Sequence, residues 1–171
     1  TVLGQLLSKT YEVKIFGING STSLKNGDRP YWKLKVFRTA TIFTPQIVNI
    51  KLGTYDPKTQ NWGKVGGESG ADTHTMISHF WQLPSQSQVF FCLPAPVYQI
   101  RWGINDNRLE KSGVIPVVKK AAKYMKRKII DLYKALSGKT EMFPYKIHPN
   151  SGGGGVMVQT IRTGLTKQPK N

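Results

Sequence analysis

The stretch that decides the predicted fold is residues 115–136, which read IPVVKKAAKYMKRKIIDLYKAL. Apolar residues recur in it at alternating steps of three and four, at Ile115, Val118, Ala122, Met125, Ile129, Leu132 and Leu136. Cations fill most of the remaining positions, at Lys119, Lys120, Lys123, Lys126, Arg127, Lys128 and Lys134. This spacing predicts one long amphipathic helix with an apolar seam and a cationic back.

The expected ends of this helix also have sequence signals. Pro116 suits a first helical turn, and Gly138 suits the left-handed position just after a helix. We therefore predict a helix over residues 114–138. Its seam is expected to pack on a sheet, although a strict heptad spacing also fits a coiled-coil partner.

Composition indicates a basic protein. The 171 residues include 25 Lys and Arg against 9 Asp and Glu, which gives a net charge of +16. Such a charge attracts polyanions: nucleic acid, an anionic membrane surface or an acidic protein. The length predicts a single domain. No run is apolar enough to span a membrane and no signal peptide is visible, so we expect a soluble, intracellular protein, cytoplasmic or in a nucleoid.

Few side chains suggest chemistry. The only cysteine, Cys92, lies in an apolar run and is expected to be a buried, inert thiol in a reducing compartment. Asp72, His74 and His79 offer possible metal ligands, but their spacing matches no common ligand pattern, so no metal site is predicted there. No cofactor, metal or catalytic residue is predicted, although His74, His79 and His148 leave a metal-independent nuclease open.

Before the predicted helix, the chain is rich in β-branched and aromatic residues. Strands are expected at 11–18, 31–43, 47–55 and 89–104, with a hairpin tip at 56–61 that returns through 62–65, and a polar loop at 63–88. After the helix, glycines 152–155 predict a flexible hinge before a short strand at 156–161 and a basic tail.

The predicted fold class is therefore α+β. It is an antiparallel, β-rich domain of about five to seven strands over residues 1–110, followed by the basic helix and a C-terminal strand and tail over 139–171. Strand alternation places cations and aromatic rings on the sheet face opposite the core. With the helix back, this face gives the expected nucleic-acid-binding residues: Tyr31, Lys33, Lys35, Phe37, Lys51, Tyr55, Arg101, Lys119, Lys120, Lys123, Lys126 and Arg127.

The function predicted from these features is non-enzymatic binding of single-stranded or non-sequence-specific nucleic acid, DNA or RNA. Rings would stack on bases while Lys and Arg neutralise phosphates. One alternative is a self-assembling coat protein that encloses a genome, located in a virion. Another is a basic subunit of a larger complex, and homo-oligomers are compatible with all three.

Overall fold

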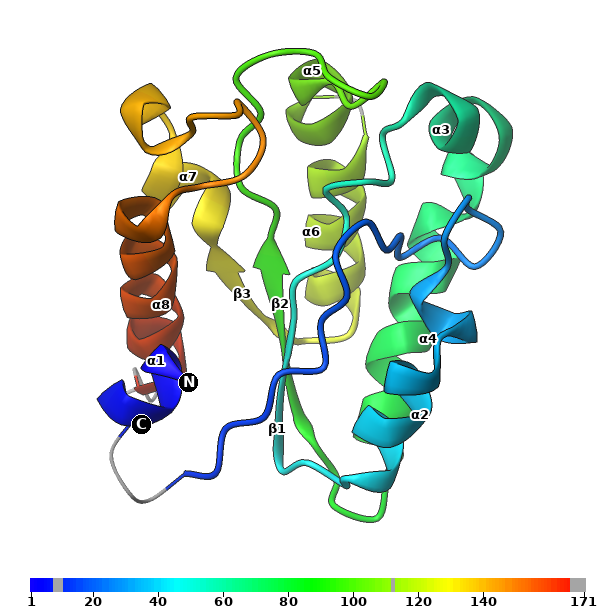
Figure 1. The fold of residues 1–171 in the computed structure, drawn as a ribbon. Coiled ribbons are helices and arrows are strands. Elements are labelled where there is room, and N and C mark those ends of the chain that lie inside the picture. Colours follow the sequence, from blue (N-terminus) through cyan, green and yellow to red (C-terminus); the bar gives the residue numbers. More distant parts are fainter. Residues whose placement is uncertain (8–10, 112, 167–171) are drawn as a thin grey trace.

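The protein is built around a small parallel sheet. The structure, a computed structural model, describes residues 1–7, 11–111 and 113–166. Its three strands are β1 (Ile47–Ile50), β2 (Gln88–Leu93) and β3 (Lys128–Asp131), in the order β1-β2-β3 (Figure 1). Both pairings are parallel, with Ile50 opposite Phe91 and Cys92 opposite Ile130. Their carboxyl ends therefore meet at one edge.

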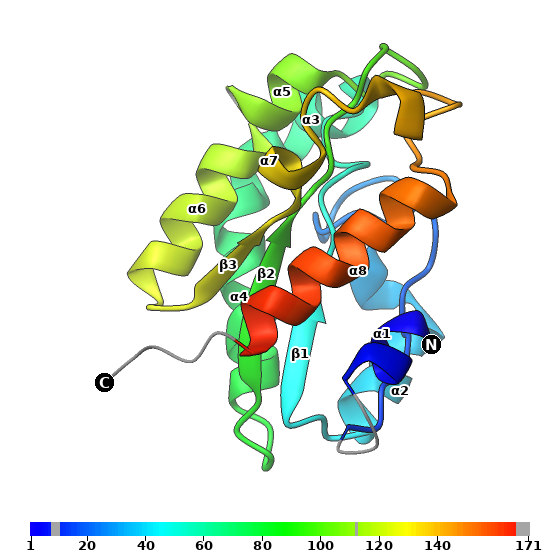
Figure 2. The ribbon, with the colours of Figure 1, turned by 90° about the vertical axis from the view of Figure 1, so that its left-hand side faces the viewer.

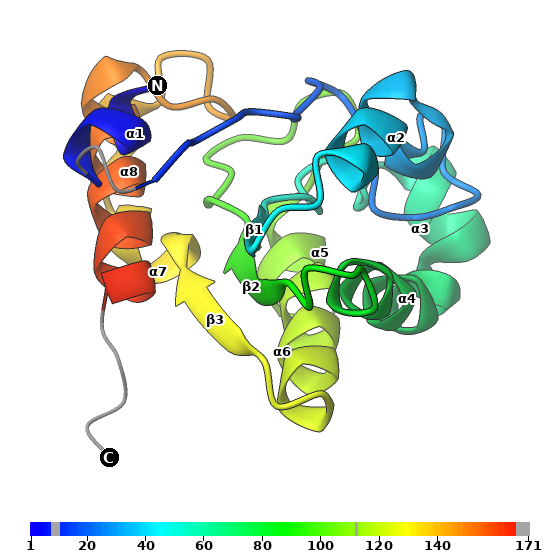
Figure 3. The same cartoon turned by 90° about the horizontal axis from the view of Figure 1, so that it is seen from below.

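Helices cover both faces of the sheet. Helices α4 (Ser69–Trp81) and α6 (Val114–Tyr124) pack together on one face, and α8 (Ser151–Thr166) lies on the other (Figure 3). Figure 2 shows α8 crossing in front of the strands, with the short helix α1 (Val2–Leu6) beside it. The result is a helix–sheet–helix sandwich.

The central strand holds two separate parts of the core. Val89, Phe91 and Leu93 pack with residues of α4 and α6, whereas Phe90 and Cys92 pack with residues of α8. A strand covered on both faces needs an almost continuous apolar run, which the sequence of β2 supplies.

The remaining helices are short, and some of them lie in the crossovers that parallel strands require. These elements are η2 (Tyr31–Lys33), α2 (Lys35–Ile42), α3 (Thr59–Val65), η3 (Gly66–Glu68), α5 (Asp106–Glu110), α7 (Leu132–Leu136) and η4 (Thr140–Met142).

The predicted 114–138 helix is wrong beyond its first half. Helix α6 starts as expected, with Pro116 in its first turn, but it ends at Tyr124. Lys126 then takes a left-handed φ of 53°, and the chain forms β3 and α7 before Gly138 ends α7 with a φ of 77°. The heptad spacing was misleading because a four-residue strand interrupts it while its apolar side chains still point into the core.

The antiparallel, β-rich fold class is also wrong. The runs at 47–55 and 89–104 each contain a strand, but most of 31–43 is helical and 11–18 is extended without a strand partner. The expected hairpin and polar loop over 56–88 instead hold α3, η3 and α4. These three helical elements form the crossover between the parallel strands β1 and β2.

The predicted glycine hinge and C-terminal strand together form helix α8. A Cβ added to Gly153 would lie 2.7 Å from the Pro149 Cβ, and one added to Gly164 would lie 2.7 Å from the Ile130 Cγ1. These glycines therefore allow close packing within a helix. The end of the predicted basic tail, residues 167–171, lies outside the described residues. No described helix is long and apolar enough to cross a membrane.

Candidate active site

Three loops meet at the carboxyl edge of the sheet, where parallel α/β folds place their ligand sites. The loop after β1 carries Tyr55, the turn after residues 11–18 carries Asn19, and the segment before α8 carries His148. The Tyr55 hydroxyl donates to Asn19 Oδ1 at 2.6 Å and lies 2.8 Å from His148 Nε2. The Tyr55 and His148 rings are 6.1 Å apart between centroids.

The protons of this triplet can be placed from its contacts. The Tyr55 hydroxyl has one proton, and the Asn19 amide oxygen can only accept, so the proton lies between Tyr55 and Asn19. His148 then donates from Nε2 to the Tyr55 oxygen. This arrangement leaves the other ring nitrogen of His148 with a lone pair and able to act as a base.

The turn that presents Asn19 is fixed to the loop after β1 by a buried carboxylate. Asp56 accepts hydrogen bonds from the Ser23 backbone N–H at 2.8 Å and from the Ser23 hydroxyl. Trp32 Nε1 donates to the Ser23 carbonyl at 2.8 Å. Gly20 permits the turn itself through a φ of 81°.

His148 is held by the segment on both of its sides. Ile147 is buried in the core, and the Lys146 carbonyl accepts from Tyr98 N–H at 2.8 Å. Lys146 has a left-handed φ of 65°, which is uncommon for a non-glycine residue. On the other side, Asn150 Oδ1 accepts from Gly153 N–H at 3.0 Å at the start of α8. The imidazole therefore has little freedom to leave the edge.

A cavity of about 970 Å³ opens beside β1 and reaches this triplet. Its walls are mainly apolar, and they come from β1, from α2, α4 and α8, and from residues 11–18. Ser21, Asn49, Lys51 and Cys92 also line it. The Ser21 Oγ and Asn49 Oδ1 atoms are buried without a hydrogen-bond partner in the described part of the chain.

Burial controls the protonation of this region. It lowers the pKa of His148, and the nearby Lys51 charge lowers it further, so the imidazole is neutral at neutral pH. Burial raises the pKa of Tyr55, which keeps its hydroxyl protonated. Burial also raises the pKa of Cys92 to about 12 despite the opposing effect of Lys51. The thiol is therefore protonated and unreactive, in agreement with the sequence prediction.

Lys51 is exposed to solvent, and its side chain lines the cavity. The protein atoms around the cavity nevertheless desolvate its amine, and this desolvation lowers the pKa of Lys51. Both hold because water reaches the amine only through the cavity.

This geometry supports general-base chemistry by His148. Across residues 1–7, 11–111 and 113–166, no carboxylate and no serine or cysteine side chain is hydrogen-bonded to that ring. The same residues contain no cluster of three or more His, Cys, Asp or Glu side chains that could hold a metal ion. Proton transfer by His148 is the chemistry that this geometry supports.

The residues predicted to bind nucleic acid do not form one surface. Tyr31 is buried, donates to the Phe16 carbonyl at 2.8 Å and packs edge-on against Phe37, so neither ring is an open stacking platform. Lys51 and Tyr55 belong to the cavity and to the triplet. The remaining predicted residues are spread over several elements. The exposed ones are Lys33, Lys35, Arg101, Lys119, Lys120, Lys123 and Lys126, whereas Arg127 is half-buried with its guanidinium carbon 4.9 Å from the centroid of the Trp81 ring.

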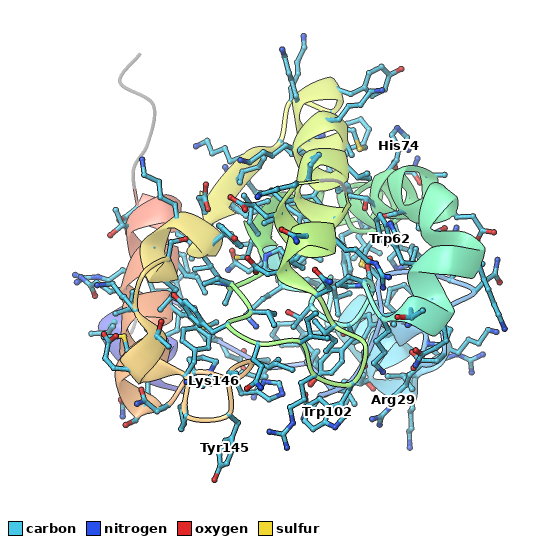
Figure 4. All side chains as sticks on the ribbon, turned by 90° about the horizontal axis from the view of Figure 1, so that it is seen from above. Arg29, Trp62, His74, Trp102, Tyr145 and Lys146 are labelled. Atoms are coloured by element: carbon cyan, nitrogen blue, oxygen red, sulfur yellow. The ribbon has the colours of Figure 1, made fainter. Side chains whose placement is uncertain are left out.

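Figure 4 looks onto the carboxyl edge and shows other exposed side chains there, Trp102 and Tyr145 among them. Arg101 stacks on Trp102, with 4.7 Å from its guanidinium carbon to the ring centroid. Arg101 is therefore at the same edge as the triplet, whereas the cations of α6 are on the outer surface of the sandwich.

The other histidines lie apart from this site. His74 is exposed on α4, and its ring centroid lies 6.0 Å from that of Tyr124. His79 Nε2 contacts the Thr41 hydroxyl at 2.8 Å, and Asp72 accepts from the Lys25 N–H. Asp72, His74 and His79 therefore do not form a metal site. His74, His79 and His148 contact different partners and do not form one catalytic site, as the nuclease alternative would require.

Sequence reasoning missed Asn19 and the role of His148. Asn19, Tyr55 and His148 are separated by 36 and 93 positions, so no local spacing connects them. A usable signal was the His-Pro-Asn sequence at 148–150, because asparagine before a glycine run can start a helix. That reading would have placed His148 at the N-terminal end of α8.

Comparison with known proteins finds a curated relative in sequence and several solved structures with a similar fold. No family model matches the chain. It is 30% identical over 178 aligned positions to an acetylxylan esterase of Xylanibacter ruminicola, a match that covers 94% of this chain but 37% of the relative. The chain thus spans little more than a third of the curated relative it matches.

Solved structures show the same fold. The native aryl esterase of M. smegmatis superposes with a TM-score of 0.75 at 15% identity, covering 96% of this chain and 82% of the esterase. A GDSL-like lipase of Bacteroides thetaiotaomicron gives a TM-score of 0.63 at 21% identity, covering 88% of this chain and 74% of the lipase. The fold is therefore that of GDSL-like esterases.

These likenesses overturn the predicted non-enzymatic nucleic-acid binder and the coat-protein alternative. The proteins that the chain resembles are ester hydrolases, and their names carry no nucleic-acid role. The structure supplies the physical reason. The basic-aromatic sheet face on which the prediction depended does not exist, because helices cover both faces of a parallel sheet.

Proposed function

We propose that this chain contributes the base-bearing part of an active site that hydrolyses acyl esters, with acetyl groups on carbohydrates as the substrate class. The observation that carries the proposal is the His148–Tyr55–Asn19 triplet at the carboxyl edge, next to a largely apolar cavity. The esterase fold and the similarity to an acetylxylan esterase support it. Because the match spans 37% of that relative, the activity of the whole protein is part of the proposal.

His148 is the general base in this proposal. Its unprotonated ring nitrogen takes a proton as an oxygen nucleophile forms a bond to the ester carbonyl carbon. When the tetrahedral intermediate collapses, the bond to the leaving alcohol breaks and His148 returns the proton to that alcohol. Tyr55 stays protonated throughout, and its oxygen accepts the hydrogen bond from His148 Nε2 that holds the imidazole ring in place.

The carbohydrate part of the proposal is supported by aromatic surface at the same edge. Trp102 is 56% exposed and Tyr145 is 66% exposed. Trp102 is also held at a left-handed φ of 52°, a conformation that bulky residues rarely adopt outside functional loops. Flat rings with a polar tip suit the mixed apolar and hydroxyl surface of a sugar.

The test is acetate release from acetylated xylo-oligosaccharides and from 4-nitrophenyl acetate. Removing a general base typically costs about 10²–10⁴ in rate, so we expect His148→Ala to lower kcat/KM by at least about 100-fold. His74→Ala is the matched control, because that imidazole is exposed on α4. Equal activity of wild type and His148→Ala, or a wild type with no activity above buffer, would overturn the proposal.

A second variant identifies the attacking oxygen. Ser21 lines the same cavity as His148, and its hydroxyl has no described partner. If Ser21 is the nucleophile, Ser21→Ala should lose activity as fully as His148→Ala. If water or a group outside the described residues attacks, Ser21→Ala should retain most of the activity.

The cellular compartment is not established by the fold. An intracellular location stays a prediction from the single cysteine and from the sequence. The single-domain organisation and a homo-oligomer also stay predictions.

A further inference from the structure

The turn at residues 101–104 holds a tryptophan in a conformation that this side chain rarely adopts. Arg101 and Ile104 exchange backbone hydrogen bonds of 3.3 Å and 2.9 Å, and Trp102 and Gly103 between them have left-handed φ values of 52° and 75°. Positive φ at both central positions is typical of a type I′ turn, which favours asparagine, aspartate and glycine. A bulky residue is strained there, and such strain clusters at functional sites.

The turn is fastened to the chain that follows β1. A Cβ added to Gly103 would lie 3.2 Å from the Thr59 backbone nitrogen, so the turn packs closely on the start of α3. Arg108, in the helix α5 that follows the turn, donates to the Pro57 carbonyl and to the Thr59 hydroxyl, each at 3.1 Å. These contacts hold the turn against the loop that carries Tyr55.

The turn is also joined to the segment that carries His148. Tyr98 precedes the turn, and its backbone N–H donates to the Lys146 carbonyl at 2.8 Å. Figure 4 shows Trp102, Tyr145 and Lys146 on the carboxyl edge of the sheet. The turn is therefore held beside the candidate active site from two directions.

Arg101 carries a charge that no acidic side chain of the described residues pairs with. The ion pairs of those residues join other side chains, and Arg101 is exposed with its guanidinium carbon 4.7 Å from the centroid of the Trp102 ring. The nearby carboxylate of Asp106 already accepts from the Val97 N–H at 2.8 Å and from the Tyr133 hydroxyl at 2.7 Å. A guanidinium held against a ring still offers N–H groups along its edge, which match the two oxygens of a carboxylate.

We propose that Arg101, held in place by Trp102, binds the carboxylate of an acidic sugar, a uronic acid residue of an acetylated polysaccharide. The acetylated sugar would lie at His148, and the uronic acid would be a neighbouring residue of the same substrate. The inference rests on the proposed ester hydrolysis for the position of the acetylated sugar. It adds that the substrate carries a negative charge.

The exposed rings at this edge favour a sugar as the source of the carboxylate. Trp102 is 56% exposed and Tyr145 is 66% exposed. A uronic acid joins one carboxylate to a ring with apolar C–H faces, and such faces pack well on aromatic side chains. Lys146 adds a second cation at the same edge, and a positive field there attracts an acidic substrate.

Binding of two unacetylated probes tests the proposal without any hydrolysis. The acidic probe is xylotriose that carries one glucuronic acid residue, and the neutral probe is xylotetraose, which has the same number of sugars. A charge-assisted hydrogen bond contributes roughly tenfold in affinity. We therefore expect calorimetry at low ionic strength to show about tenfold tighter binding of the acidic probe. Equal affinities for the two probes would overturn the proposal.

Two arginine variants separate a local contact from the overall charge. Arg101→Met and Arg38→Met each remove one exposed cation, and Arg38 belongs to α2. We expect Arg101→Met to bind both probes equally and Arg38→Met to keep the preference for the acidic probe. Equal preferences in the two variants would overturn the proposal, because the acidic probe would then respond only to the net charge of +16.

A glycine variant tests whether the strained tryptophan serves this contact. Trp102→Gly relieves the strain, since glycine adopts a left-handed φ readily, so we expect Tm to rise by at least about 2 °C. The variant also removes the ring that holds Arg101, so the preference for the acidic probe should fall to that of Arg101→Met. An unchanged preference would overturn the proposal, because the ring would then have no part in binding.

Amide chemical shifts locate the bound acidic probe. We expect shifts at residues 99–104 and 145–148. Shifts confined to the cationic residues of α6 would place the probe on another surface and would overturn the proposal. Acetate release without any preference for the acidic probe would count against this inference alone, whereas the preference without acetate release would count against the proposed function alone.

Discussion

The central strand β2 and the edge strand β1 differ in how completely they bury similar residues. Phe90, Phe91 and Cys92 of β2 are at most 1% exposed, with strands on both edges and helices on both faces. Ile47 and Val48 of β1 are apolar and β-branched as well, yet they remain half-buried beside the cavity. A strand-forming sequence therefore fixes the local backbone, while burial depends on the neighbours that the fold provides.

The largest expected difference between β2 and β1 is in how much a truncated side chain lowers the free energy of unfolding. Phe91→Ala should lower the free energy of unfolding by about 3–5 kcal/mol, because it opens a cavity in a fully packed region. Val48→Ala should cost no more than about 1.5 kcal/mol, because its surroundings are already open. Urea denaturation of the two variants gives both values. Similar losses would show that β1 is as well packed as β2 and would remove the contrast.

A second test uses the carboxylate that fixes the Asn19 turn beside β1. Burial raises the pKa of Asp56 to about 6, even though the hydrogen bonds from Ser23 act in the opposite direction. A carboxyl group with a raised pKa stabilises the folded protein while it is protonated, below its unfolded value of 3.8, and this contribution is lost as the pH rises through about 6.

We therefore expect wild type to lose on the order of 1 kcal/mol of stability between pH 5 and pH 8 relative to Asp56→Asn, which cannot titrate. Denaturation of both proteins at the two pH values isolates this contribution, because other titrating groups cancel. Parallel pH dependence of the two proteins would show that Asp56 keeps an ordinary pKa.

The sequence predicted the position of two strands, two helix-end residues and the burial of Cys92, but not the parallel sheet or the candidate site. The β-branched runs at 47–55 and 89–104 each hold a strand, and Pro116 and Gly138 lie where helix-end chemistry expects them. Those signals are local, because they depend on backbone preferences of a few residues. Burial of Cys92 followed from the same local apolar run.

Local sequence signals did not reveal that the strands are parallel. Gly66, Gly67, Gly70 and Pro84 made the segment that contains α4 look like a loop, and the glycines at 152–155 hid the start of α8. In the case of Gly153 the reason is a tertiary contact, since Pro149 and Met142 leave no room for a side chain. The triplet of Asn19, Tyr55 and His148 likewise exists only after the crossovers have formed.

A smaller effect is expected on the pH dependence of the candidate active site. Burial and then the Lys51 charge lower the pKa of His148 from its usual 6.5. The proposed ester hydrolysis should therefore persist at mildly acidic pH and fall only when the pH drops below this lowered pKa. Lys51→Met removes the charge and keeps the apolar stem. The acid limb of the pH–rate profile should then move to higher pH.

Lys119→Met on the outer face of α6 is the matched control for this shift, because it removes one cation without touching the cavity. Its pH–rate profile should coincide with that of wild type. An unchanged acid limb in Lys51→Met would mean that Lys51 does not act on the base.

The smallest effect is expected on the surface that first suggested nucleic-acid binding. Replacing the exposed Lys119, Lys120 and Lys123 of α6 together by Ala should change the unfolding free energy little, by about 0.5 kcal/mol or less per site. Ester hydrolysis should also be unchanged. A marked loss of either would show that the cationic back of α6 takes part in the site.

The most direct test of the contrast is residue-resolved amide hydrogen exchange on the unaltered 171-residue chain. We expect strong protection of the β2 amides at Phe90 and Phe91, which have ladder partners on both sides, and rapid exchange of residues 11–18, which have no ladder partner among the described residues. We also expect alternation along β1, with only the amides that face β2 protected. Uniform protection of β1 and of residues 11–18 at the level of β2 would contradict this contrast, because the edge of β1 would then already be closed.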